Sequence, residues 1–191
     1  FDQSMLCHIL MCMRSLKMET ADLLCIDAFA GIEPYHGLGQ LSPDQLASLY
    51  DQRRPLTERQ ILFAERVDRA FALQDPDVFK ALTHYDKAPL PWIPAAVRRW
   101  MEELPGETRM GRLEGLALQA VRAGCERAAD IFSFVSAKET PPQFWGDIAL
   151  WEKINGLADR EPALVRIEGP RVRRPQWEGT VDLKRFRIYP G

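Results

Sequence analysis

The stretch Leu23-Leu24-Cys25-Ile26-Asp27 decides how the first part of the chain is interpreted. Four apolar residues end at a carboxylate, and a run of this length is typical of a strand buried on both faces of a parallel sheet. Before it, residues 1–18 place apolar side chains at helical spacing. A helix followed by a buried strand is half of an α/β unit, so we expect part of a parallel-sheet domain here.

The predicted first helix starts at Phe1, without a Met and without a capping residue before Asp2. This favours further sequence upstream, so we expect the chain to hold only a remnant of its α/β domain. No basic region precedes the apolar positions and no small-residue cleavage site follows them, which argues against a signal peptide. The apolar run is also shorter than the ~20 residues of a membrane span, so no membrane partner is expected.

The composition is that of a soluble globular protein, since 46% of the 191 residues are hydrophobic and 27% are charged. A formal net charge of −2 excludes a polycation that coats nucleic acid or anionic lipid, so any nucleic-acid binding must be local. The four cysteines are too few and too scattered for a disulfide scaffold: Cys7, Cys12, Cys25 and Cys125. They indicate a reducing compartment, and we expect a cytoplasmic protein.

Helix-capping patterns and prolines organise the middle of the chain. Ser42-Pro43-Asp44-Gln45 and Thr57-Glu58-Arg59-Gln60 are capping boxes, and Asp75-Pro76 starts a further helix. Prolines separate the helices that follow, and Pro105-Gly106 breaks the chain. We therefore expect an α/β remnant at residues 1–54, a helical connector at 55–107 and a separate domain at 108–191.

Residues 108–191 follow a different pattern. Apolar spacing predicts three short helices, over 113–121, 128–135 and 148–157, and alternation predicts strands at 163–167 and 184–189. Three helices followed by two strands is the order of a winged helix. The expected fold class is α+β and mostly helical, with the remnant of an α/β parallel-sheet domain, a helical connector and a C-terminal winged-helix-like domain.

The glycine-rich loop after the predicted strand is the candidate ligand site. In open parallel sheets ligands bind at the carboxyl ends of the strands, which is where Asp27 lies. The residues predicted to bind a ligand are Asp2, Asp27, His36, Gly37 and Gly39. In the alternative, structural interpretation Asp27 caps loop amides and His36 bonds to the backbone. The loop lacks the third glycine of a dinucleotide fingerprint, so no cofactor can be named.

Metal and nucleophile motifs are weak. Cys7, His8 and Cys12 are of residue types that ligate zinc, but Cys7 and Cys12 lie about 140° apart around a helix. No second ligand pair follows at a zinc-ribbon interval, so we expect no metal site. The sequence also contains no Ser elbow, no P-loop and no Cys/His dyad in a recognisable context, and no reaction can be assigned.

Basic side chains gather in the last part of the chain. Residues 109–191 hold 14 Lys and Arg against 11 Asp and Glu, whereas residues 1–108 hold 11 against 16. Seven of them lie on and around the predicted wing, where they could contact phosphate: Arg166, Arg171, Arg173, Arg174, Lys184, Arg185 and Arg187. DNA is therefore a candidate partner, and a second copy of the chain is another. The predicted third helix offers few basic or amide side chains, so a domain for protein contact or a structural lid is the alternative.

Several segments together resemble a bacterial family of unknown function. They are Phe1-Asp2-Gln3, Cys25-Ile26-Asp27, residues 37–46, Leu90-Pro91 with Arg99, and residues 144–147 with Trp151 and Leu157. The family pairs an N-terminal α/β domain of unknown function (number eighteen thirty-five) with a C-terminal winged-helix-like domain of unknown function (number thirty-six fifty-eight). The resemblance covers nearly the whole chain. It implies this fold and an N-terminal part that precedes Phe1, and it supplies no activity or cofactor that can be carried over to this chain.

Two functions remain open from the sequence. The first is a ligand- or partner-binding module whose winged-helix-like domain serves recognition, with DNA as one target. The second is an enzyme of unknown reaction whose site lies at the carboxyl end of the sheet, around Asp27 and His36.

Overall fold

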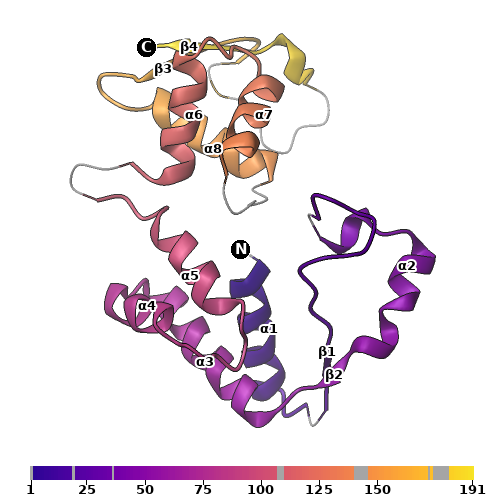
Figure 1. Ribbon diagram of the computed structural model, residues 1–191. Coiled ribbons are helices and arrows are strands. Elements are labelled where there is room, and N and C mark those ends of the chain that lie inside the picture. Colours follow the sequence, from indigo (N-terminus) through magenta and orange to yellow (C-terminus); the bar gives the residue numbers. More distant parts are fainter. Residues whose placement is uncertain are drawn as a thin grey trace. The chain divides into compact units, whose positions relative to one another are not determined.

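The computed structural model describes residues 2–18, 20–35, 37–106, 110–139, 146–171, 173 and 181–191. The chain forms two compact units, Phe1–Met101 and Glu102–Gly191 (Figure 1). Both units are built mainly from helices, and each holds a two-stranded antiparallel sheet. The expected α+β class with mostly helical content is confirmed.

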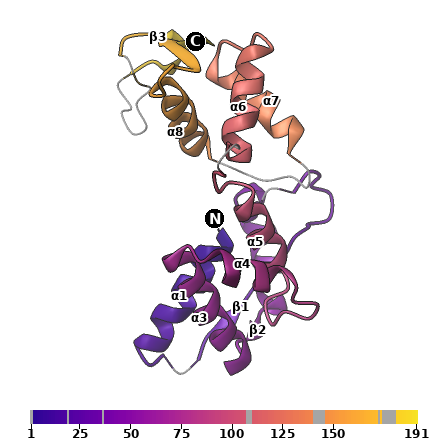
Figure 2. The same cartoon turned by 90° about the vertical axis from the view of Figure 1, so that its left-hand side faces the viewer.

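Two pairs of packed helices make the core of the N-terminal unit. Its helices are α1 (Asp2–Ser15), α2 (Pro43–Ser48), α3 (Glu58–Leu73), α4 (Pro76–Thr83) and α5 (Ile93–Met101). Helix α1 runs along α3, and α4 packs against α5 (Figures 1 and 2). The Phe71 ring joins the pairs, with its centroid 5.1 Å from that of Phe79 and 5.6 Å from that of Trp100.

The helix starts in this unit are those that the sequence predicts. Ser42 and Thr57 each accept a hydrogen bond from the amide three residues on, and the glutamine side chain there accepts one from the cap's own amide. Asp75 accepts from two amides at the start of α4. Because a cap side chain satisfies donors that would otherwise have no partner, these starts are set by local sequence alone.

The run at residues 23–26 does not form a strand of a parallel sheet, so that expectation is wrong. Only its start is extended, as β1 (Asp22–Leu23), which pairs antiparallel with β2 (Arg54–Pro55). Leu24, Cys25 and Ile26 are half-buried, not covered on both faces. Within the described ranges both sheets are antiparallel, and no neighbouring strand is present that would bury a parallel one.

The pairing of β1 with β2 closes a long excursion of the chain. Residues 24–53 leave the helices at β1 and return at β2 (Figure 1), carrying η1 (Leu38–Gln40), α2 and η2 (Tyr50–Gln52). Asp22 Oδ2 accepts a hydrogen bond from Arg53 Nε at 2.9 Å across the closure. With α1 packed on α3 as well, residues 1–54 and 55–101 belong to one unit and are not divided at residue 54.

The C-terminal unit has the predicted order of three helices and then two strands. Its elements are α6 (Arg112–Arg122), α7 (Ala128–Lys138), α8 (Asp147–Ala158), β3 (Val165–Glu168), η3 (Leu183–Arg185) and β4 (Arg187–Pro190). The strands pair antiparallel from Val165 with Pro190 to Glu168 with Arg187. Both strands begin later than predicted, at residue 165 instead of 163 and at residue 187 instead of 184. The second delay is larger because Asp182 accepts a hydrogen bond from the Lys184 amide at 3.0 Å and starts a tight turn there.

A backbone hydrogen bond links β4, at the end of the chain, to the turn between α6 and α7. The Ile188 amide donates to the Glu126 carbonyl at 2.9 Å, so β4 bonds β3 on one side and the α6–α7 turn on the other. The helices and the ribbon enclose one core, which includes Leu113, Ala117, Val121, Ile131, Leu150, Ile154, Leu157, Val165 and Ile188.

Gly169 is required where the ribbon passes a buried ring. A Cβ at this position would lie 2.5 Å from Cδ1 of Phe186, whose side chain is 1% exposed. Gly169→Ala should therefore lower the free energy of unfolding of the C-terminal unit by ~1–3 kcal/mol, as overpacking does. Gly115→Ala is the matched control, because a Cβ in the middle of α6 meets nothing within 4 Å and should stabilise by up to ~1 kcal/mol. Urea unfolding of both variants measures the two effects, and equal stabilities would contradict the expected contact.

Across the part of the chain that the structure describes, no helix is long and apolar enough to cross a membrane.

Candidate ligand-binding pocket

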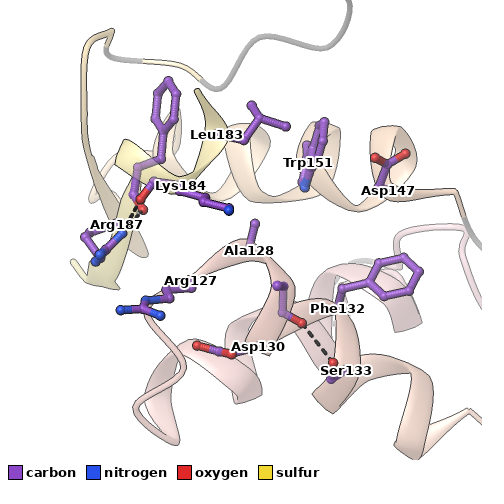
Figure 3. Close-up of a pocket in the computed structure, with 12 residues that line it drawn as sticks. Arg127, Ala128, Asp130, Phe132, Ser133, Asp147, Trp151, Leu183, Lys184 and Arg187 are labelled. Carbon is purple, nitrogen blue, oxygen red and sulfur yellow. Dashed lines mark hydrogen bonds between the residues drawn. The ribbon is translucent and has the colours of Figure 1, made fainter. Parts of the chain in front are cut away.

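The C-terminal unit holds a pocket of about 660 Å³ between α7, α8 and the segment η3–β4 (Figure 3). This volume lies in the range of small-molecule sites in proteins. Residues from three separate stretches line it: Arg127, Ala128, Ala129, Asp130, Phe132, Ser133, Asp147, Trp151, Leu183, Lys184, Phe186 and Arg187. The pocket lies within one unit, so its geometry depends on that unit alone.

Three basic side chains mark one part of the pocket. Arg127 precedes α7, Lys184 lies in η3, and Arg187 begins β4. The Arg187 guanidinium is held in place, because Nη1 donates to the carbonyls of Lys184 at 2.7 Å and Phe186 at 2.9 Å. None of the three forms an ion pair with a described carboxylate, so their charges are available to an anion.

Apolar and aromatic side chains also line the pocket. Trp151 on α8 and Phe186 ahead of β4 contribute largely buried rings, with exposed fractions of 8% and 1%. Phe132 on α7 is 37% exposed and lies near Asp147, on the side of the pocket away from Arg127 and Arg187 (Figure 3). The pocket therefore has three basic side chains and the Asp130 carboxylate toward one end, and an exposed aromatic ring with a second carboxylate, Asp147, toward the other.

The residues predicted to form an N-terminal ligand site do not meet at a sheet edge. The parallel sheet whose carboxyl end was to gather them is absent from the described residues. Asp2 begins α1, Asp27 is exposed, and Gly37 and Gly39 lie at the start of η1 and within it. His36 lies outside the described residues. The ligand site therefore stays a prediction that rests on the loop sequence alone, because the parallel sheet that was to position its residues is not found among the described residues.

The neighbourhood of this loop instead holds three other polar side chains. Gln3 of α1 hydrogen-bonds Cys25, and Tyr35 lies near the same thiol. Burial raises the pKa of Cys25 above its ordinary value, which the Gln3 hydrogen bond opposes and Asp27 reinforces. Among the described atoms Gln3 Oε1 and the Tyr35 hydroxyl are buried without a partner. A thiol with a raised pKa is a poor nucleophile at neutral pH, so this group does not support catalysis.

The seven residues predicted to bind nucleic acid divide into three groups. Arg166 pairs with Glu168 and lies over the Tyr189 ring, 5.3 Å from its centroid, and Arg173 pairs with Asp159. Lys184 and Arg187 line the pocket, while Arg171 and Arg185 are exposed. Arg174 lies outside the described residues. The six that the structure describes do not form one continuous free basic surface, because Arg166 and Arg173 are ion-paired.

The charge bias also depends on where the chain is divided. Cut at Glu102, where the structure separates the units, the C-terminal unit holds 14 Lys and Arg against 14 Asp and Glu. Carboxylates outnumber the one basic residue on α8 and its C-cap: Asp147, Glu152 and Asp159 are exposed, and Lys153 pairs with Glu152 at 3.8 Å. Carboxylates on the helix that would enter a DNA groove would repel phosphate.

Sequence reasoning missed the pocket because its walls come from three distant stretches. Trp151 and Phe132 fall on apolar positions of the helices predicted over 148–157 and 128–135, so nothing in the sequence marked them as pocket residues. The only sequence signal was the basic cluster at Lys184, Arg185 and Arg187, within the strand predicted at 184–189. In the described parts of the chain no group of three or more His, Cys, Asp or Glu is arranged to hold a metal ion.

Comparisons with protein-family models, curated proteins and solved structures return no match. The resemblance to the two-domain bacterial family therefore stays a prediction, carried by the quoted segments alone.

Proposed function

We propose that the C-terminal unit is a binding module for a small ligand that joins an anionic group to an apolar, ring-sized body. The observation that carries this is the pocket in which Arg127, Lys184 and Arg187 border a space lined by Trp151 and Phe132. In this proposal the unit is the winged-helix-like domain of a cytoplasmic bacterial protein of the family that the chain resembles.

Charge and shape both support a small ligand over duplex DNA. The free basic residues Arg127 and Lys184 border a concave, mostly apolar space, whereas Arg166 and Arg173 on the outer surface are already paired with carboxylates. A hydrogen bond to a charged group contributes ~1.5–3 kcal/mol to the free energy of binding. Burial of an aromatic ring adds a hydrophobic contribution that does not depend on charge. Together these terms favour amphipathic anions over both neutral hydrophobes and simple inorganic anions.

Two matched fluorescent probes test the proposal on the full chain. 8-Anilinonaphthalene-1-sulfonate is an aromatic anion, and N-phenyl-1-naphthylamine has the same rings without the sulfonate. We expect the sulfonate to bind at least tenfold more tightly than the amine, and its affinity to fall as salt is raised. Arg127→Gln with Lys184→Gln should remove that tenfold preference and leave the amine unchanged.

Arg166→Gln is the control, because this residue carries the same charge on the same unit but lies outside the pocket. It should change neither affinity. Equal binding of the two probes, or a double variant that still prefers the sulfonate, would overturn the proposal. Salt-sensitive binding of a random-sequence DNA duplex that survives the double variant would favour the DNA function instead.

A further inference from the structure

A cysteine, a histidine and an aspartate form a hydrogen-bonded chain where α1 packs on α3. His8 and Cys12 lie one turn apart on α1, and Asp68 lies on α3. His8 Nδ1 is 3.0 Å from Asp68 Oδ1, and His8 Nε2 is 3.6 Å from Cys12 Sγ. This is the order of nucleophile, base and orienting carboxylate that activates a side chain for attack.

The carboxylate decides which ring nitrogen carries the proton. An ionised aspartate can only accept hydrogen bonds, so Nδ1 of His8 donates to Asp68. In the neutral ring Nε2 is then the acceptor, and its lone pair faces the Cys12 thiol. Nε2 of His8 can therefore accept the proton of the Cys12 thiol, and it does not donate a hydrogen bond to Sγ.

Two of the other cysteines are disfavoured as nucleophiles, Cys7 by full burial and Cys25 by its raised pKa. Cys12 is partly exposed and the His8 side chain is 60% exposed, so a small reagent can reach both. Cys7 on the inner face of α1 is fully buried, and burial, reinforced by the negative charge of Asp68, raises its pKa to about 12. Cys7 is therefore inert, and Cys25 has a pKa raised mainly by burial.

Exposed apolar side chains lie beside Cys12. Met5, Ile9 and Leu16 lie within about 60° of Cys12 around the helix and are 47%, 49% and 74% exposed. A thiol flanked in this way suits a low-molecular-weight disulfide with apolar or aromatic groups. Attack on sulfur also needs no oxyanion hole, unlike attack on an acyl carbon.

We propose that Cys12 is a nucleophilic thiol that exchanges with low-molecular-weight disulfides, with His8 as general base and Asp68 as positioning residue. In the step, His8 Nε2 takes the thiol proton as Sγ attacks one sulfur of the disulfide. A new S–S bond to Cys12 forms while the original S–S bond breaks. The departing thiolate takes the proton from His8 and leaves as a thiol, so Cys12 is oxidised and the leaving half of the disulfide is reduced.

The test uses the full chain and 4,4′-dithiodipyridine, a neutral aromatic disulfide, with mass spectrometry to assign each mixed disulfide. At pH 7 we expect Cys12 to react at least tenfold faster than Cys125, a partly exposed cysteine that is not hydrogen-bonded to His8. His8→Gln, at an exposed position, should lower the Cys12 rate at least tenfold without affecting the fold. Asp68→Asn should lower it about threefold or more, since the ring loses its fixed orientation.

Glu65→Gln is the control, because it removes an exposed α3 carboxylate that pairs with Arg14 and not with His8. It should leave the rate unchanged. A second readout is the pH dependence of alkylation by iodoacetamide, which should differ between the wild type and His8→Gln and be the same in the wild type and Glu65→Gln. Equal rates for Cys12 and Cys125, or no effect of His8→Gln, would overturn the proposal, and fast alkylation with slow disulfide exchange would overturn its choice of substrate.

Discussion

Phe79→Ala is expected to destabilise the N-terminal unit by ~3–5 kcal/mol, the cost of removing a fully buried aromatic ring from a packed core. The Phe79 side chain is 0% exposed on α4, and its ring meets Phe71 edge to face, which in turn contacts Trp100 of α5. Domains of this size are stable by only ~5–15 kcal/mol, so the loss is a large part of the total. Urea unfolding gives the change in free energy, and amide hydrogen exchange locates it in α3, α4 and α5.

The matched control is Leu73→Ala. Leu73 ends the neighbouring helix α3 but is 64% exposed, so its truncation should change stability by less than ~0.5 kcal/mol. A similar cost for both variants would show that the three-ring contact does not organise this core.

Raising the pH above 9 is expected to weaken the same unit through Cys7. Its thiol ionises near 9.0 when unfolded but has a pKa of about 12 when folded, because burial and Asp68 oppose the thiolate. Between these values the unfolded chain binds fewer protons, so the free energy of unfolding falls with pH by up to ~1.4 kcal/mol per unit. The stabilisation is complete below pH 9 and is lost as the pH rises toward 12.

Urea unfolding at pH 8 and pH 10 measures this effect. The wild type should lose ~1.4 kcal/mol more than Cys7→Ala between the two pH values, whereas Cys125→Ala should behave as the wild type does. Equal pH dependence in the wild type and Cys7→Ala would mean that Cys7 does not remain protonated in the folded unit.

Local sequence predicted the elements whose determinants are local. Ser42, Thr57 and Asp75 cap their helices as expected, since the donor amides lie within three residues of each cap. The order of α6, α7, α8, β3 and β4 was also predictable, because each element carries its own periodicity.

Tertiary pairing explains what the sequence could not predict. A four-residue apolar run such as 23–26 is compatible with several environments, and the choice depends on which strand arrives beside it. Here β2 arrives antiparallel and reaches only Leu23. The pocket and the His8–Asp68 pair could not be predicted from the sequence for the same reason. Each brings together residues that lie up to 60 positions apart along the chain.

The backbone hydrogen bond from Ile188 to Glu126 makes one end of the pocket more rigid than the other. It fixes the distance between the strand that begins at Arg187 and the turn that leads into Arg127, and two backbone carbonyls hold the Arg187 guanidinium itself. At the other end the Phe132 ring is 37% exposed and can change rotamer. Ligands should therefore be selected strictly by the size of their charged group and tolerantly by the length of their apolar part.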